Sequence, residues 1–155
     1  MNRAGVRPRS CLSRSHGLAA VELAVLMPVY FMLMLGVAEL GRACYEYNTL
    51  TKLVRAGATY VVREANNGAG VVDLTKANLL TDTRNLVVFG TPAAGGAPLL
   101  TGLSVGDITV TAAGTNITVS ASYGYTPLFA VIPGFGMGDV TTVRTMTAAT
   151  TMVLL

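Results

Sequence analysis

The chain has 155 residues, of which 52% are hydrophobic and 12% charged, about half the charged share of an average globular protein. Four of its eleven basic residues precede Gly17, which leaves seven basic against eight acidic residues in the remainder. Because that remainder is nearly neutral and has no cluster of Lys or Arg, it lacks the electrostatic footprint of a nucleic-acid-binding protein. The composition favours one modest domain joined to a membrane or assembly segment.

The first 17 residues form a basic leader without an acidic residue, which carries Arg3, Arg7, Arg9 and Arg14. An apolar run follows at residues 18–38, where Glu22 is the only charge, and about 20 apolar residues suffice for a helix to cross a bilayer. Since basic flanks stay in the cytoplasm, we predict a single-pass protein of the cytoplasmic membrane with its N-terminus inside and its C-terminal part outside. A secretory signal peptide fits less well, because its apolar core is usually only about 7–15 residues long.

The junction between leader and apolar run carries the most informative residues. Gly17 and Leu18 lie at the edge of the predicted span, and Glu22 follows within it. A carboxylate at the bilayer centre costs about 2.5–3.5 kcal/mol, so such residues usually face a partner charge. The pattern therefore indicates a cleavage site after Gly17 and an assembly charge at Glu22, whose partner is the freed amine of Leu18 on the same or a neighbouring subunit.

Other residues of the apolar run are suited to packing between helices in lipid. Small residues let helix backbones approach closely, and a proline is tolerated in a membrane because neighbouring groups satisfy the freed carbonyl. These packing residues are Ala19, Ala20, Ala24, Pro28 and Gly36. We expect a bend or a melted turn near Pro28.

Residues 39–66 are predicted to continue the helix beyond the membrane as an amphipathic extension. Apolar residues that follow one another by three or four positions draw one stripe along a helix. The predicted stripe comprises Leu40, Cys44, Tyr47, Leu50, Val54, Gly57 and Val61. This pattern leaves Arg42 and Glu46 off the stripe, and Asn66-Asn67-Gly68 ends the helix.

Residues 67–155 are predicted to form a small β-rich domain outside the membrane. Its first part is expected to hold a short helix at residues 74–80, a strand at residues 86–89 and a loop from Gly90 to Gly102.

The second part of this domain contains two alternating segments, residues 107–112 and 117–123, which predict a hairpin with one apolar face. The residues expected to pack on the helix stripe are Ile108, Val110, Ile117, Val119 and Ala121. Residues 140–154 are predicted as a last, Thr-rich strand at the sheet edge. Residues 127–138 are expected to form an apolar loop that contacts lipid or a partner.

No residue pattern indicates catalysis, a metal or a cofactor. The single histidine, His16, and one of the two cysteines, Cys11, lie in the leader, so cleavage would leave Cys44 alone. The glycine-rich residues 134–138 lack a following Lys and are read as a turn instead of a phosphate-binding loop. We therefore expect no enzyme, no metal site, no cofactor and no intramolecular disulfide in the processed chain.

Residues 17–28 (Gly-Leu-Ala-Ala-Val-Glu-Leu-Ala-Val-Leu-Met-Pro) and 36–42 together resemble the TadE-like family. Residues 53–58 are similar to the family's Arg-x-Gly-Ala segment, and residues 119–123 with Pro127-Leu128 are similar to its closing hairpin. These proteins are pseudopilins, or minor pilins, of the tight-adherence (Tad/Flp) type IV pilus. The resemblance implies cleavage by a prepilin peptidase after Gly17. One departure is Leu23, since family members commonly have an aromatic residue after the glutamate.

The resemblance also implies partners and a pilin-like α+β fold, in which a long N-terminal helix packs against a small antiparallel sheet. The implied partners are the prepilin peptidase, other pilin subunits, the inner-membrane assembly platform and membrane lipid. The expected function is assembly or initiation at the tip or base of an adhesive pilus, and incorporation into the extracellular pilus stays open. The alternative is an unprocessed, permanently anchored envelope scaffold or receptor. A major pilin is disfavoured because major Tad subunits are much smaller.

Overall fold

The computed structural model describes residues 15–66, 72–93, 95–128, 131–132, 140–141 and 144–154. The chain divides into two compact units, Met1–Leu40 and Gly41–Leu155. The leader arginines, Asn67-Gly68 and the glycine-rich residues 134–138 lie outside the described residues.

Helix α1 (Ser15–Glu64) begins in the first unit, where its sequence is apolar on every side. It is long and apolar enough to cross a membrane, and no residue of its most apolar 18-residue window is buried. The helical assignment runs through Pro28 without a break, so the melted turn predicted there is wrong. A proline removes one intrahelical hydrogen bond and crowds the carbonyl four residues earlier, and α1 continues on both sides of it.

The part of α1 that belongs to the second unit buries one stripe. Leu50, Val54, Ala58, Val61 and Ala65 recur at intervals of three or four residues and form one side of the core. The predicted stripe is therefore right from Leu50 onward. It is wrong before Leu50, where Leu40, Cys44 and Tyr47 are exposed.

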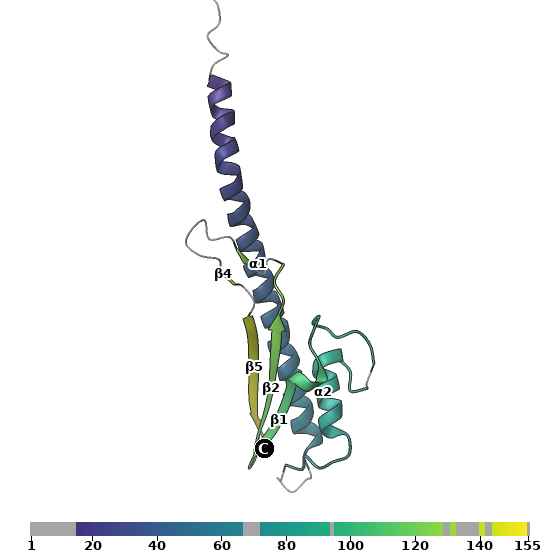
Figure 1. The fold of residues 1–155 in the computed structure, drawn as a ribbon. Helices are drawn as coiled ribbons and strands as arrows, with labels where there is room; N and C mark the ends of the chain where they lie inside the picture. The colour runs from purple at the N-terminus through teal and green to yellow at the C-terminus, as the bar shows by residue number, and fades with distance from the viewer. Residues whose placement is uncertain are drawn as a thin grey trace, which may run out of the picture. The chain divides into compact units, whose positions relative to one another are not determined.

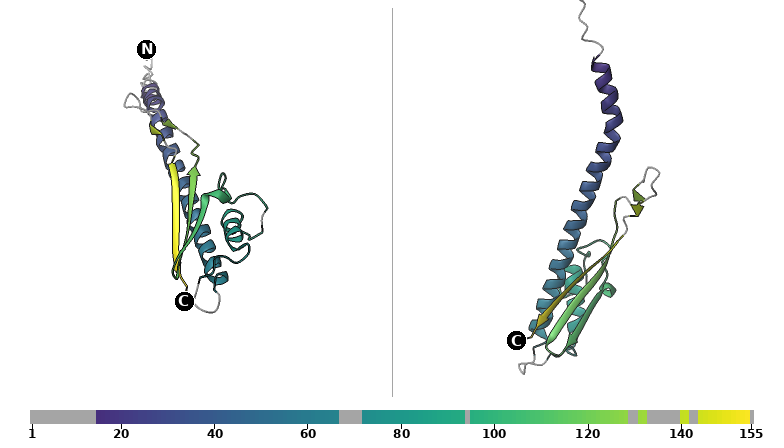
Figure 2. Two further views of the ribbon diagram at one scale, coloured as in Figure 1. Left: turned by 60° about the horizontal axis from the view of Figure 1, so that its bottom comes forward. Right: turned by 90° about the vertical axis from the view of Figure 1, so that its left-hand side faces the viewer.

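A three-stranded antiparallel sheet supplies the other side of the core, with β2 (Asn116–Tyr125) between β1 (Ile108–Ala113) and β5 (Arg144–Val153). Figures 1 and 2 show the sheet running along the C-terminal part of α1. The predicted hairpin is confirmed, and Gly114 at φ +64° provides the left-handed residue of its tight turn. The inward residues of the hairpin also agree: Ile108, Ile117, Val119 and Ala121 are buried, and Val110 is half-buried against the core.

The last predicted strand is correct in type and in its edge position, but it divides into two. Val140–Thr141 form strand β4, which pairs with β3 (Val131–Ile132) in a separate two-stranded ladder, and β5 starts at Arg144. Strand β5 pairs with β2 along its whole length, from Tyr125↔Arg144 to Asn116↔Val153. The described residues of the predicted loop Gly90–Gly102 hold no helix or strand, as expected.

Helix α2 (Leu79–Phe89) replaces both the short helix predicted at residues 74–80 and the strand predicted at residues 86–89. Leu79, Thr83 and Val87 are spaced by four, and all three are buried on one face. This face packs on α1 at Gly57, where an added Cβ would lie 2.5 Å from Val87 Cγ2. The close approach of the two helices overrides the β propensity of the Leu86–Phe89 run.

A short 3-10 helix, η2 (Val105–Asp107), leads from the loop into β1. Leu100 and Leu103, just before it, complete the core that α1, α2 and the sheet share. The architecture confirms the predicted α+β, pilin-like fold of a long N-terminal apolar helix with a small antiparallel sheet packed against it.

Candidate functional site

The first turns of α1 carry the predicted processing and assembly residues. Leu18 is 75% exposed, and a Cβ added at Gly17 would meet nothing within 4 Å. Glu22 is exposed among Leu18, Val21 and other apolar neighbours. No hydrogen bond or ion pair to the Glu22 carboxylate occurs within the described part of the chain. The carboxylate is therefore available for a charge supplied from outside these residues.

The apolar side chains around Glu22 are exposed on all sides of the helix. Exposed fractions are 62% for Val21, 57% for Phe31 and 72% for Val37. The predicted packing residues Ala19, Ala20, Ala24, Pro28 and Gly36 are exposed as well. A helix that is apolar all round needs lipid or other helices on every face, whereas a docking groove on one partner would cover only a stripe.

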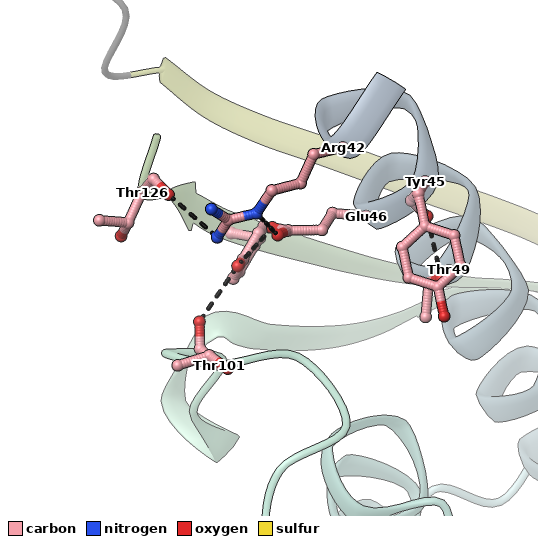
Figure 3. A network of polar contacts seen from close by, with 7 residues as sticks. Arg42, Tyr45, Glu46, Thr49, Thr101 and Thr126 are labelled. Atoms are coloured by element: carbon pink, nitrogen blue, oxygen red, sulfur yellow. Dashed lines mark hydrogen bonds and ion pairs between the residues drawn. The ribbon is translucent and has the colours of Figure 1, made fainter. Parts of the chain in front are cut away.

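A second group of functional interest lies where β2 ends beside α1, and Figure 3 shows it from close by. We call Arg42, Glu46, Tyr123 and Tyr125 the Arg42 cluster. Arg42 Nε donates to Glu46 Oε1 at 3.0 Å, and the guanidinium lies 5.8 Å from the centre of the Tyr125 ring. The Tyr123 hydroxyl lies 2.8 Å from Glu46 Oε2, to which it donates.

Two backbone carbonyls complete the contacts of the Arg42 cluster. Arg42 Nη2 donates to the Thr126 carbonyl at 3.3 Å, and the Tyr123 hydroxyl lies 3.1 Å from the Thr101 carbonyl. Burial, and after it the hydrogen bond to the Glu46 carboxylate, raise the pKa of Tyr123 to about 12. Tyr123 therefore stays a neutral donor near pH 7. The cluster joins helix, strand and loop and holds no arrangement of nucleophile and base.

The sequence pattern missed the Arg42 cluster because it placed both charges off the buried stripe. The i,i+4 spacing of Arg42 and Glu46 was a visible signal for an ion pair. Their other partners, Tyr123 and Thr126, lie about 80 positions away in the chain, as 77 and 84 residues separate the bonded pairs. Local periodicity carries no information about such contacts.

Two carboxyl groups outside the Arg42 cluster, Asp73 and Asp107, hold turns. Hydrogen bonds from the Ser104 side chain and backbone N–H hold the pKa of the Asp107 carboxyl below its usual value, and Thr75 acts in the same way on Asp73. Within the described ranges, no three His, Cys, Asp or Glu side chains come together in a group that could hold a metal ion.

The comparisons with known proteins bear on helix α1. A family model described as TadE-like protein matches residues 17–59, so the match begins at Gly17 and includes the whole apolar run. Comparison with curated proteins and with solved structures gives no match. The family resemblance drawn from the sequence is thereby confirmed over residues 17–59, which are similar to the TadE-like family, a family that is associated with the Tad pilus and is not an enzyme family.

Proposed function

We propose that this TadE-like chain is a minor pilin or pseudopilin. A prepilin peptidase cleaves it after Gly17, and the processed subunit takes part in assembly or initiation at the tip or base of an adhesive Tad-type IV pilus. One observation carries the proposal: Glu22 is the sole charge of an all-round exposed apolar segment and stands five positions after the residue at which the family match begins.

Cleavage at this position changes the electrostatics of the segment. The leader arginines orient insertion and are then removed, while the peptidase frees an amine on Leu18. Leu18 and Glu22 are i,i+4 neighbours, so the amine lies on the same face of the helix as the carboxylate. The Glu22 carboxylate, costly in lipid when alone, then gains a positive partner on its own or on an adjacent subunit.

Transfer from membrane to fibre follows from the all-round apolar surface. Lipid and a bundle of pilin helices both keep these side chains away from water, so the hydrophobic free energy changes little on transfer. The small residues Ala19, Ala20, Ala24 and Gly36 allow close contact between backbones in either setting. The subunit is thus a single-pass protein of the inner membrane before assembly, with its C-terminal domain outside.

Processing is tested by expressing the full chain with and without a prepilin peptidase and measuring intact mass and N-terminal sequence. We expect Leu18 as the first residue when the peptidase is present. Gly17→Leu should keep the leader, because a bulky side chain blocks approach to the backbone, whereas the matched control Gly36→Leu should be cleaved normally. A wild-type chain that retains residues 1–17 would leave the anchored scaffold or receptor as the better description.

The assembly charge is tested separately. Glu22→Ala should be cleaved normally but should not enter the pilus fraction, because the Leu18 amine loses its partner. The control is Glu64→Ala, which removes an exposed carboxylate at the other end of α1 and should assemble as the wild type does. Normal amounts of Glu22→Ala subunit in purified pili would contradict the charge-pairing step.

A further inference from the structure

We propose that the peptidase reaches the bond after Gly17 through local unwinding of the first turn of α1, and that Gly17 is the residue that permits this unwinding. The inference rests on the proposed function, because it concerns cleavage at this bond. It adds a specificity-determining property of the substrate, which is a helix that opens easily at the bond and not only a small side chain before it.

The structure places the bond between Gly17 and Leu18 inside a helix. Helix α1 begins at Ser15, so both residues of the bond are helical and lie at its first turn. In an α-helix the Gly17 carbonyl accepts a hydrogen bond from the N–H four residues later, at Val21. Proteolysis of a folded segment acts on the locally opened state, so this bond is protected until the turn unwinds.

Unwinding prepares the bond for hydrolysis. The oxygen of one water molecule bonds to the Gly17 carbonyl carbon and the C–N bond breaks, which gives the Gly17 carboxylate and the Leu18 ammonium group. The negative charge of the intermediate develops on the carbonyl oxygen, where a peptidase places hydrogen-bond donors. An unwound Gly17 no longer accepts from Val21, so its carbonyl oxygen is free for those donors.

Within the described residues, the fold gives no reason for a glycine at this position. A Cβ added at Gly17 would meet no atom within 4 Å, and Gly17 does not adopt a positive φ. Gly17 is exposed and Leu18 is 75% exposed, so packing does not hold this turn in place. A glycine in a helix is destabilising relative to alanine, because its backbone loses more conformational freedom.

The weak point that Gly17 creates is confined to the start of α1. Leu18, Ala19 and Ala20 have high helix propensity, and the next glycine along α1 is Gly36. The first N–H groups of any helix lack intrahelical partners, so its first turn opens more easily than its middle. Gly17 therefore lowers helix stability at the bond that is cleaved and leaves the following turns of α1 intact.

The test measures kcat/KM for release of the leader from the full chain by a prepilin peptidase in detergent micelles, followed by intact mass. This ratio depends on the fraction of chains whose first turn is open. Gly17→Ala should lower it about fivefold, the ratio that the helix propensities of the two residues give. Ala20→Gly should raise it by a similar factor. The matched control is Ala38→Gly, the same substitution at an exposed position far along α1, which should leave the ratio unchanged.

The decisive variant combines Gly17→Ala with Ala20→Gly. We expect the second glycine to restore kcat/KM to near the wild-type value, and amide hydrogen exchange of residues 19–21 to rise and fall with kcat/KM across the variants. A double variant as slow as Gly17→Ala, or hydrogen exchange that does not follow kcat/KM, would overturn the inference and leave cleavage after Gly17 standing. A wild-type chain that is not cleaved at all would remove the proposed function and this inference with it.

Discussion

Helix α1 runs through both units of this chain, and its leucines have opposite surroundings in the two. Leu33, in the first unit, is 63% exposed, whereas Leu50, in the second, is fully buried against the sheet. The first unit has apolar residues on every side of the helix, and the second has them on one stripe. Hydrophobic content alone does not separate these cases, but the angular distribution around the helix axis does.

This difference teaches which surroundings stabilise each unit. The second unit contains its own core, so its stability depends on packing within the chain. The first unit exposes its apolar surface and depends on lipid or neighbouring helices. Substitutions of the same type should therefore act on different measurements in the two units.

The largest contrast is expected for a leucine truncated in each unit. Leu50→Ala should lower the free energy of unfolding of the second unit by about 2–5 kcal/mol, because it leaves a cavity in the core. Leu33→Ala should leave that free energy unchanged. Hydrogen exchange of β2 amides, followed by mass spectrometry on the full chain in detergent micelles, measures both. Equal losses for the two variants would mean that the first unit shares the core after all.

Much of the fold was predictable from periodicity, because its longest elements have strong local signals. The apolar run and the stripe from Leu50 onward predicted α1, and alternation around Val110 and Val119 predicted the hairpin. The α2 error has a physical cause: a run of four apolar residues fits a buried strand or a buried helix. What decides it is the approach to Gly57, which is a contact between distant parts of the chain.

Some residues of the candidate sites were likewise recognisable in the sequence, and others were not. Gly17 and Glu22 stand out in the sequence because a charge and a glycine are unusual at the edge of an apolar run. Glu46 does not stand out, since a glutamate on an amphipathic helix usually faces water. Its inward position depends on the hydroxyl of Tyr123, which is 77 residues away. The predicted stripe contained the neighbouring Tyr47 and not Glu46, but Tyr47 is exposed.

Two glycines of α1 offer a second comparison, in which the expected change in the free energy of unfolding is smaller. Gly57→Ala should destabilise the second unit by about 1–3 kcal/mol, because its Cβ would lie 2.5 Å from Val87 Cγ2 and force α2 away. Gly41→Ala, where an added Cβ meets nothing within 4 Å, should be neutral or stabilising by up to about 1 kcal/mol through helix propensity. Thermal unfolding of the two variants under one condition checks the sign of each. A stabilising Gly57→Ala would show that the two helices are not in close contact.

The smallest effect is expected at the Arg42 cluster, where one hydroxyl joins the strand to the helix. Tyr123→Phe should lower the free energy of unfolding by about 1–2 kcal/mol, because the half-buried Glu46 carboxylate loses a donor. Tyr45→Phe, which removes an exposed hydroxyl, should have no effect. Urea titration of the full chain in micelles near pH 7 measures both. Equal effects of the two substitutions would show that the hydrogen bond from Tyr123 to Glu46 does not contribute to stability.

The same residue makes stability depend on pH in a defined direction. The pKa of Tyr123 is raised to about 12 in the folded chain, above its ordinary value of 10.0, so above pH 10 the unfolded chain binds fewer protons at this residue. The contribution is complete below pH 10 and is lost as pH rises to about 12. Tyr60, whose pKa burial also raises, contributes to the wild type and to Tyr123→Phe alike. The difference between these two chains therefore isolates Tyr123, and it should shrink between pH 10 and 12. A difference that stays constant over this range would show that the hydroxyl is not buried beside Glu46.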